Sequence, residues 1–147
     1  MKIEEKIKML YEKDSSETYK NLLELEILSE NENSLYKYFD EFLSMIDNDK
    51  YTIRVRGYRL LCKQAKWDVD NKINSSVHIL LSKVEDDKPT VVRLKIKALQ
   101  DIIVVKKDIQ DKIKERLLEI DTFKYKDTMQ PLILKDIEET LKLIDEN

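Results

Sequence analysis

The sequence predicts an all-α protein, and three observations support this prediction. Apolar residues recur at three- and four-residue spacing along nearly the whole chain, which is the period of an amphipathic helix. The 147 residues include one glycine and two prolines, too few turn residues for an all-β fold. Apolar positions also repeat after 37 or 38 residues, the length of a helix pair. We therefore expect residues 1–147 to form one domain, a short right-handed α-solenoid of about four stacked helix pairs.

The first half of the chain contains four segments with helical periodicity. The first is expected to end near Lys13, and residues 14–16 then offer caps for the second. The second is expected to end before the polar tract at 29–34, which is typical of a turn. The third covers 35–46 and the fourth about 52–67, with an Asp-Asn-Asp break between them.

The second half contains four more. Helical periodicity covers residues 73–84, about 86–106, about 109–120 and a segment from about Asp127 onward. Pro89 falls in the first turn of the sixth helix, where proline is well tolerated. Pro131 is tolerable only if it lies in the first turn of the eighth. The β-branched run at 102–105 is assigned to the sixth helix, since no other segment could pair with it as a strand.

The internal repeat explains why the helices should be stacked in pairs. The apolar positions of 35–46 superpose on those of 73–84 at a shift of 38 residues. The dipeptide Val55-Arg56 falls on Val92-Arg93 at a shift of 37. A lone helix pair cannot bury the apolar faces of both helices, so neighbouring pairs must pack on one another.

The repeated turns resemble a known pattern. Residues 87–93, with the sequence DKPTVVR, are similar to the hairpin turn of a HEAT repeat, in which an acid and a proline precede a Val-Arg pair. Residues 49–56 repeat this pattern without the proline, and residues 124–130 form a degenerate copy. The resemblance implies a HEAT-like, or ARM-like, solenoid whose second helices line a concave surface.

Two stretches resemble a narrower family. Residues 54–67 and 125–132 are similar to small uncharacterised bacterial HEAT-like proteins, some of which carry a SufBD label that implies iron–sulfur cluster assembly. The chain has one cysteine, Cys62, so thiolates alone could not hold a cluster or a structural zinc. We expect no metal and no cofactor.

Charge and hydropathy narrow the location and the partners. The net charge is −3, from 27 basic and 30 acidic residues, so the chain is not basic overall. The N-terminal residues lack the apolar region of a secretory signal, and no apolar run approaches the ~18 residues of a membrane span. We expect a soluble cytoplasmic protein that does not bind membranes.

No residue pattern points to catalysis. His78 is the only histidine, and the helical phase places it outside the apolar stripe as a surface residue. Cys62 falls on the apolar face of its helix, where a thiol acts as a small hydrophobic group. The carboxylate pairs 86–87 and 138–139 are expected by chance in a chain with 30 acids. We expect no enzymatic activity.

The fourth helix carries a one-sided cluster of cations, the one feature of the sequence that points to a binding site. With Tyr58 at 0°, the side chains of Lys66, Arg59, Lys63 and Arg56 lie between about 80° and 160°, unbroken by an acid. Arg93 matches Arg56 one repeat later, and Lys97 lies close to it. Ile53, Leu60 and Trp67 form a second side, which either packs in the core, as we expect, or forms an exposed apolar strip beside these cations. We call one set the basic ridge: Arg56, Arg59, Lys63, Lys66, Arg93 and Lys97.

Two interpretations of the ridge remain open at this point. Arg56 and Arg93 could brace neighbouring turns through acids such as Asp49 and Asp87. The other cations of the ridge could bind a partner or could only keep the helix soluble. The use of arginine favours binding. The chain has 22 lysines and only 5 arginines, yet four of the arginines fall in or beside this stripe. Lysine would serve solubility equally well, whereas arginine's planar fork suits carboxylates and phosphates.

The sequence therefore predicts a noncatalytic protein-interaction or scaffold module with a locally acidic partner. The alternative is a nucleic-acid-binding protein related to HEAT-like DNA alkylation-repair glycosylases, which are longer and more basic. The oligomeric state is left open by the sequence.

Overall fold

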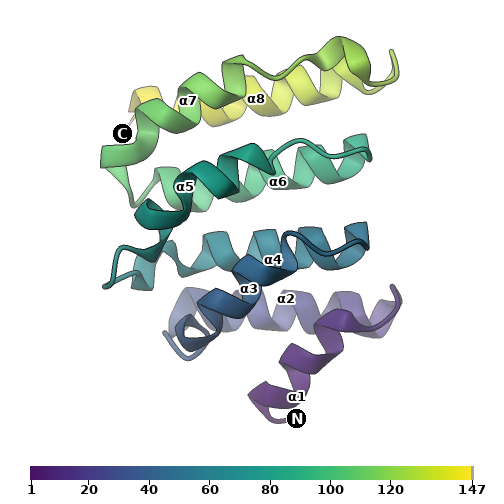
Figure 1. The fold of residues 1–147 in the computed structure, drawn as a ribbon, viewed down its shortest axis with the longest axis vertical. Helices are drawn as coiled ribbons and strands as arrows, with labels where there is room; N and C mark the ends of the chain where they lie inside the picture. Colours follow the sequence, from purple (N-terminus) through teal and green to yellow (C-terminus); the bar gives the residue numbers. More distant parts are fainter. Residues whose placement is uncertain (147) are drawn as a thin grey trace. The chain divides into compact units, whose positions relative to one another are not determined.

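The computed structural model describes residues 1–146, and the chain divides into two compact units, Met1–Trp67 and Asp68–Asn147. Over residues 1–146 the regular secondary structure is entirely helical, with eight α-helices, five 3-10 helices and no strand (Figure 1). This confirms the all-α prediction. Within the same residues no helix is both long enough and apolar enough to cross a membrane.

Unit 1 contains two helix hairpins, α1 with α2 and α3 with α4. Its elements are α1 (Ile3–Lys8), the 3-10 helix η1 (Met9–Tyr11), α2 (Ser16–Asn31), η2 (Tyr36–Tyr38), α3 (Phe39–Met45), α4 (Tyr51–Lys63) and η3 (Gln64–Trp67). Helix α4 packs against both α3 and α2. The buried side chains of Leu25, Phe42, Tyr58 and Leu60 are part of the core of this unit.

The start of α2 is fixed by its own residues. The Ser15 side chain accepts a hydrogen bond from Thr18 N at 3.2 Å, and Ser15 N donates to Thr18 Oγ1 at 2.9 Å. This capping box satisfies backbone groups that the first helical turn leaves unpaired. The predicted cap at 14–16 is therefore confirmed.

The end of α2 differs from the prediction. The helix continues to Asn31, into the polar tract that was expected to form a turn. The physical reason is that Ser29 is buried and faces the end of α4. Its Oγ accepts a hydrogen bond from Gln64 Nε2 at 3.0 Å, and its carbonyl accepts one from Trp67 Nε1 at 2.6 Å.

Unit 2 also contains two hairpins, α5 with α6 and α7 with α8. Its elements are α5 (Lys72–Ser82), α6 (Pro89–Ile103), η4 (Lys107–Ile109), α7 (Gln110–Leu118), η5 (Thr122–Lys124) and α8 (Gln130–Glu146). Helix α8 packs along α6 and α7 (Figure 1). Pro89 opens α6 and Pro131 is the second residue of α8, so both prolines lie in first turns as predicted.

Helix α6 ends earlier than expected, at Ile103 instead of about Lys106. The backbone of Lys106 leaves the helical region, with φ −105° and ψ 78°. Its buried side chain then reaches Asp68 at 3.1 Å and Asn71 Oδ1 at 2.9 Å. Asp68 also accepts hydrogen bonds from the backbone of Lys72 and Ile73, at the start of α5. The end of α6 is thus tied to the start of α5.

The apolar stripes that repeat along the sequence are core residues in the structure. Val55 and Val92, the matched valines of the two units, are both buried. Buried residues also occupy all five repeat positions in α5 and after it: Ile73, Val77, Leu80, Leu81 and Val84. In the earlier copy four positions are buried, and Leu43 is half-buried. Ile53 and Leu60 are buried as predicted, and Trp67 is half-buried.

Candidate interaction surface

Arg59 is the most informative residue of the basic ridge. It lies on α4 and reaches α2, where its Nε donates to Glu26 Oε2 at 3.1 Å and its Nη2 to Glu26 Oε1 at 2.7 Å. Two parallel charge-assisted bonds of this kind hold a guanidinium in one orientation. Its side chain is 18% exposed, and Glu26 is less exposed still. The structure thus fixes this arginine instead of leaving it free in solvent.

The pairing uses only one edge of the Arg59 fork. A guanidinium has five N–H donors, and Glu26 takes one from Nε and one from Nη2. Among residues 1–146, no acceptor is bonded to Nη1 or to the second hydrogen of Nη2. The opposite edge of the fork therefore offers parallel donors to an external carboxylate or phosphate.

Lys63 and Lys66 both contact Glu30 of α2. Lys63 Nζ lies 2.9 Å from Glu30 Oε1, and this hydrogen bond holds the pKa of the Glu30 carboxyl below its ordinary value. Lys66 Nζ donates to the Glu30 carbonyl at 2.6 Å and lies over the Trp67 ring. The prediction that these cations share one side of α4 is consistent with these contacts. The acid that faces them, Glu30, comes from α2, and sequence reasoning did not predict that pairing.

Arg56 occupies a different environment from the other cations of α4. Arg56 is only 4% exposed, and its Nη1 donates to the carbonyls of Leu10 and Glu12 at 2.9 and 2.8 Å. Its Nη2 lies 3.5 Å from Asp14 Oδ1 and 3.4 Å from Thr18 Oγ1. These contacts match the bracing interpretation, with Asp14 in place of the expected Asp49. Arg56 therefore adds no accessible charge to the surface.

Arg93 and Lys97 lie in unit 2, on α6, and both face one acid of α8. Arg93 Nε donates to Asp136 Oδ2 at 2.7 Å, and Nη2 lies 3.4 Å from Oδ1. The hydrogen bond to Asp136 raises the pKa of the Arg93 guanidinium above its ordinary value. Lys97 Nζ is 3.8 Å from Asp136 and its side chain is half exposed. The acid that pairs with Arg93 is Asp136, in place of the expected Asp87.

The two units therefore use one arrangement. In each, an arginine of the longer second helix is held through its Nε–Nη2 edge by a buried or half-buried acid of a neighbouring helix. The structure brings the ridge together as two sets, Arg56, Arg59, Lys63 and Lys66 in unit 1 and Arg93 and Lys97 in unit 2.

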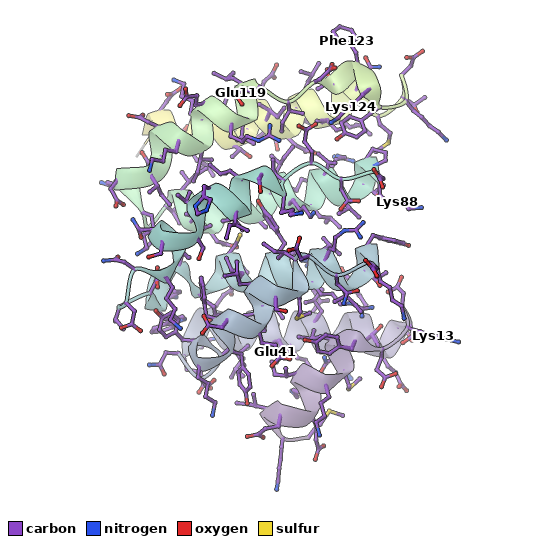
Figure 2. All side chains as sticks on the ribbon, viewed as in Figure 1. Lys13, Glu41, Lys88, Glu119, Phe123 and Lys124 are labelled. Atoms are coloured by element: carbon purple, nitrogen blue, oxygen red, sulfur yellow. The ribbon has the colours of Figure 1, made fainter. Side chains whose placement is uncertain are left out.

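A second charged cluster, which the sequence did not reveal, surrounds Glu85 in unit 2. Its carboxylate accepts from Lys124 at 2.6 Å, Arg116 at 2.8 Å and the Tyr125 hydroxyl at 3.3 Å. Burial raises the pKa of Glu85, but the hydrogen bonds from Lys124 and Arg116 outweigh it and hold the pKa below its ordinary value. Phe123, next to Lys124, projects from the turn and is exposed (Figure 2). The cluster joins the α5–α6 turn to η5.

His78 and Cys62 lie where their helical phase predicted. His78 is exposed and borders a hollow of about 360 Å³ between α5 and α7. Cys62 is a buried free thiol. Glu138 and Glu139 are exposed on α8, whereas the side chain of Asp86 is buried against Lys95. Within residues 1–146, no group of three or more His, Cys, Asp or Glu side chains is placed to hold a metal ion.

Comparisons with known proteins identified no relative of this chain. A scan against protein-family models and searches of curated proteins and of solved structures gave no match for this chain.

Proposed function

We propose that this protein is a noncatalytic interaction module, a HEAT-like α-solenoid of four helix pairs that binds a locally acidic protein partner. The two hairpins in each unit and the 37–38 residue repeat support the solenoid. Solenoids present extended surfaces formed by equivalent helices, and such surfaces commonly bind other proteins.

The observation that carries the proposal is the open edge of Arg59. Glu26 orients the guanidinium in advance, so little side-chain entropy is lost when a second carboxylate binds the free Nη1–Nη2 edge. Lys66 extends the same surface, because its exposed ammonium makes one hydrogen bond to a backbone carbonyl and no ion pair among the described residues. Arg93 offers the same free edge in unit 2.

The pairing also limits how the surface can be tested. Charge reversal at Arg59 and Lys63 would place two new acids against Glu26 and Glu30, and unit 1 would lose stability for reasons unrelated to binding. Arg59→Lys is the better change, because it keeps a cation beside Glu26 and removes the parallel donors. Arg116→Lys is the matched control, since Arg116 also pairs with a glutamate but lies outside the ridge.

The experiment compares proteins captured by the wild-type chain and by both variants from a lysate of the source cells, quantified by mass spectrometry. We expect Arg59→Lys to lose acidic partners by about tenfold or more, as loss of a bidentate contact predicts. Arg116→Lys should keep them, and the thermal unfolding of both variants should resemble wild type. Equal capture by all three proteins would contradict the proposal.

The same edge could bind phosphate, so nucleic acid is the second candidate. Fluorescence anisotropy with a short DNA duplex at several salt concentrations separates the two, because phosphate binding weakens steeply as salt rises. Under the leading proposal the duplex binds weakly, and Arg59→Lys does not alter that binding. Tight, salt-sensitive binding that Arg59→Lys abolishes would favour the nucleic-acid function instead.

A further inference from the structure

A short turn, residues 68–71, begins unit 2 and follows directly on the last residue of unit 1. The one apolar side chain of this turn, Val69, is 85% exposed, and Asp70 and Asn71 are exposed as well. Segments that bury little apolar surface open at a low cost in free energy. Apolar burial therefore contributes little to holding this turn in place, and we call residues 68–71 the strap.

Polar contacts hold the strap on unit 2. The Asp68 side chain is fully buried, and its two oxygens accept hydrogen bonds from Lys72 N at 2.8 Å and from Ile73 N at 2.9 Å. These amides are among the donors that the first turn of a helix leaves unpaired. The strap thus caps the start of α5, and its release would expose both amides to water.

Lys106, which follows the end of α6, joins the first and last residues of the strap. Its Nζ lies 3.1 Å from Asp68 Oδ2 and donates to Asn71 Oδ1 at 2.9 Å. Lys106 is itself buried, so the ammonium and the Asp68 carboxylate each stabilise a charge that would be costly alone. Loss of the lysine would therefore weaken both ends of the strap.

The backbone of Asn71 favours release. It has φ 54° and ψ 37°, and among residues 1–146 it is the only residue with a positive φ. Residues other than glycine populate this left-handed region sparsely. Asn71 is the N-cap residue of α5, yet its side chain makes no capping hydrogen bond, and its Oδ1 accepts from Lys106 instead. Without Lys106, Asn71 could return to a more populated conformation.

We propose that the strap opens and closes as one local unit, and that Lys106 is the latch that keeps it closed. Trp67, the residue before the strap, is held within unit 1 by the hydrogen bond from its Nε1 to the Ser29 carbonyl. A closed strap therefore leaves no slack in the chain at the boundary, and an open strap becomes a flexible linker between the units. The inference uses no residue of the basic ridge, so it does not depend on the proposed function.

Native-state hydrogen exchange of the wild-type chain, followed by nuclear magnetic resonance at low urea concentrations, tests whether the opening is local. A local opening exposes little surface, so the exchange rates of the Lys72 and Ile73 amides should hardly change with urea. The amide of Leu99, a buried residue in the middle of α6, should exchange faster as urea rises. Equal urea dependence at all three amides would overturn the proposal, because the strap would then open only when unit 2 unfolds.

Lys106→Met tests the latch, because it keeps a long apolar side chain and removes the ammonium. We expect the Lys72 and Ile73 amides to exchange at least about tenfold faster, and the Leu99 amide to keep its wild-type rate. Lys107→Met is the control, since the neighbouring lysine is exposed, and it should exchange like wild type.

Wild-type exchange in Lys106→Met, or equal acceleration in Lys107→Met, would overturn the role of Lys106. Circular dichroism checks that both variants fold. The urea dependence is measured on the wild type, so it decides whether the strap opens locally even if Lys106→Met does not fold.

Discussion

Two tyrosine hydroxyls are held by glutamates and should ionise late. Burial and a neighbouring glutamate raise the pKa of Tyr125 from its ordinary 10.0 to about 12, and the same two causes act on Tyr11 beside Glu41. The phenol is therefore kept protonated in the folded state. Its contribution to stability is present below pH 10.0 and is lost as the pH rises toward about 12.

Tyr125→Phe tests this directly. The tyrosinate absorbance of the wild type should include a late step near pH 12, and the variant should lose part of that step. The free energy of unfolding should also fall less steeply with pH in the variant above pH 10.0. A wild-type chain that stays folded, by circular dichroism, and shows no ionisation step near pH 12 would contradict the assignment.

A buried ion pair closes the α5–α6 turn. Lys95 Nζ lies 3.2 Å from Asp86 Oδ2 and 2.8 Å from the Lys83 carbonyl, and both side chains are almost fully buried. Removing one partner of a buried pair leaves an uncompensated charge, so Asp86→Ala should cost about 3–5 kcal/mol of unfolding free energy. Chemical denaturation measures this loss.

The neighbouring carboxylate is the control for that substitution. Asp87 is exposed, and Asp87→Ala should change the free energy of unfolding by less than about 0.5 kcal/mol. Similar losses for Asp86→Ala and Asp87→Ala would show that Lys95 does not depend on Asp86.

Sequence reasoning at this scale succeeded for single residues and failed for pairs. The helical phases of His78 and Cys62 correctly placed the histidine on the surface and the cysteine in the core. The partners of Arg59 and Arg93 were not predictable, because Glu26 and Asp136 lie 33 and 43 residues away, offsets that the repeat does not contain. Lys95 did give a signal that was missed: it lies within the apolar stripe of α6 and therefore requires a nearby acid.

At the scale of elements, Gly57 determines how closely α3 approaches α4. A Cβ at this position would lie 2.5 Å from the Met45 Cβ and 2.9 Å from the Phe42 carbonyl oxygen. Neither atom is the flexible end of a side chain, so the helices would have to separate. In the sequence the lone glycine argued only against an all-β fold, and it did not indicate this contact.

Gly57→Ala should therefore destabilise unit 1. Alanine favours a helix over glycine by about 1 kcal/mol, but overpacking typically costs about 1–3 kcal/mol, and the clash here involves a backbone oxygen. We expect a lower thermal midpoint than wild type by calorimetry. A midpoint equal to or higher than wild type would mean that α3 can shift away at little cost.

The presence of each helix was predictable, because apolar residues recur clearly at the helical period. The points at which α2 and α6 end were not predictable, because they depend on residues distant in the sequence. The end of α2 depends on Ser29, whose burial against Gln64 no local pattern contains. The end of α6 depends on Lys106 reaching back to Asp68. Caps made by adjacent residues, such as Ser15 with Thr18, were predictable because both partners lie in one short segment.

For the whole molecule, the repeat predicted which residues form cores, and the charge pattern predicts a binding surface on the fourth helix. The structure shows how its arginines are held within each unit. Arg59 pairs with Glu26 in unit 1 and Arg93 with Asp136 in unit 2, each through its Nε–Nη2 edge. The expected partner is correspondingly one that presents carboxylates in pairs, which fit the free edge of an arginine better than single charges do.

The most direct test follows the Arg59 side chain by nuclear magnetic resonance while the labelled chain is titrated with an octaglutamate peptide. Two arginines are compared in one spectrum, Arg59 with a free edge and the buried Arg56, whose Nη1 and Nη2 both donate within the unit. The Arg59 Nε–H signal should shift progressively with peptide and return as salt is added, while the Arg56 signal stays in place. An Arg59 signal that does not move, or equal shifts at both arginines, would contradict a specific carboxylate-binding surface.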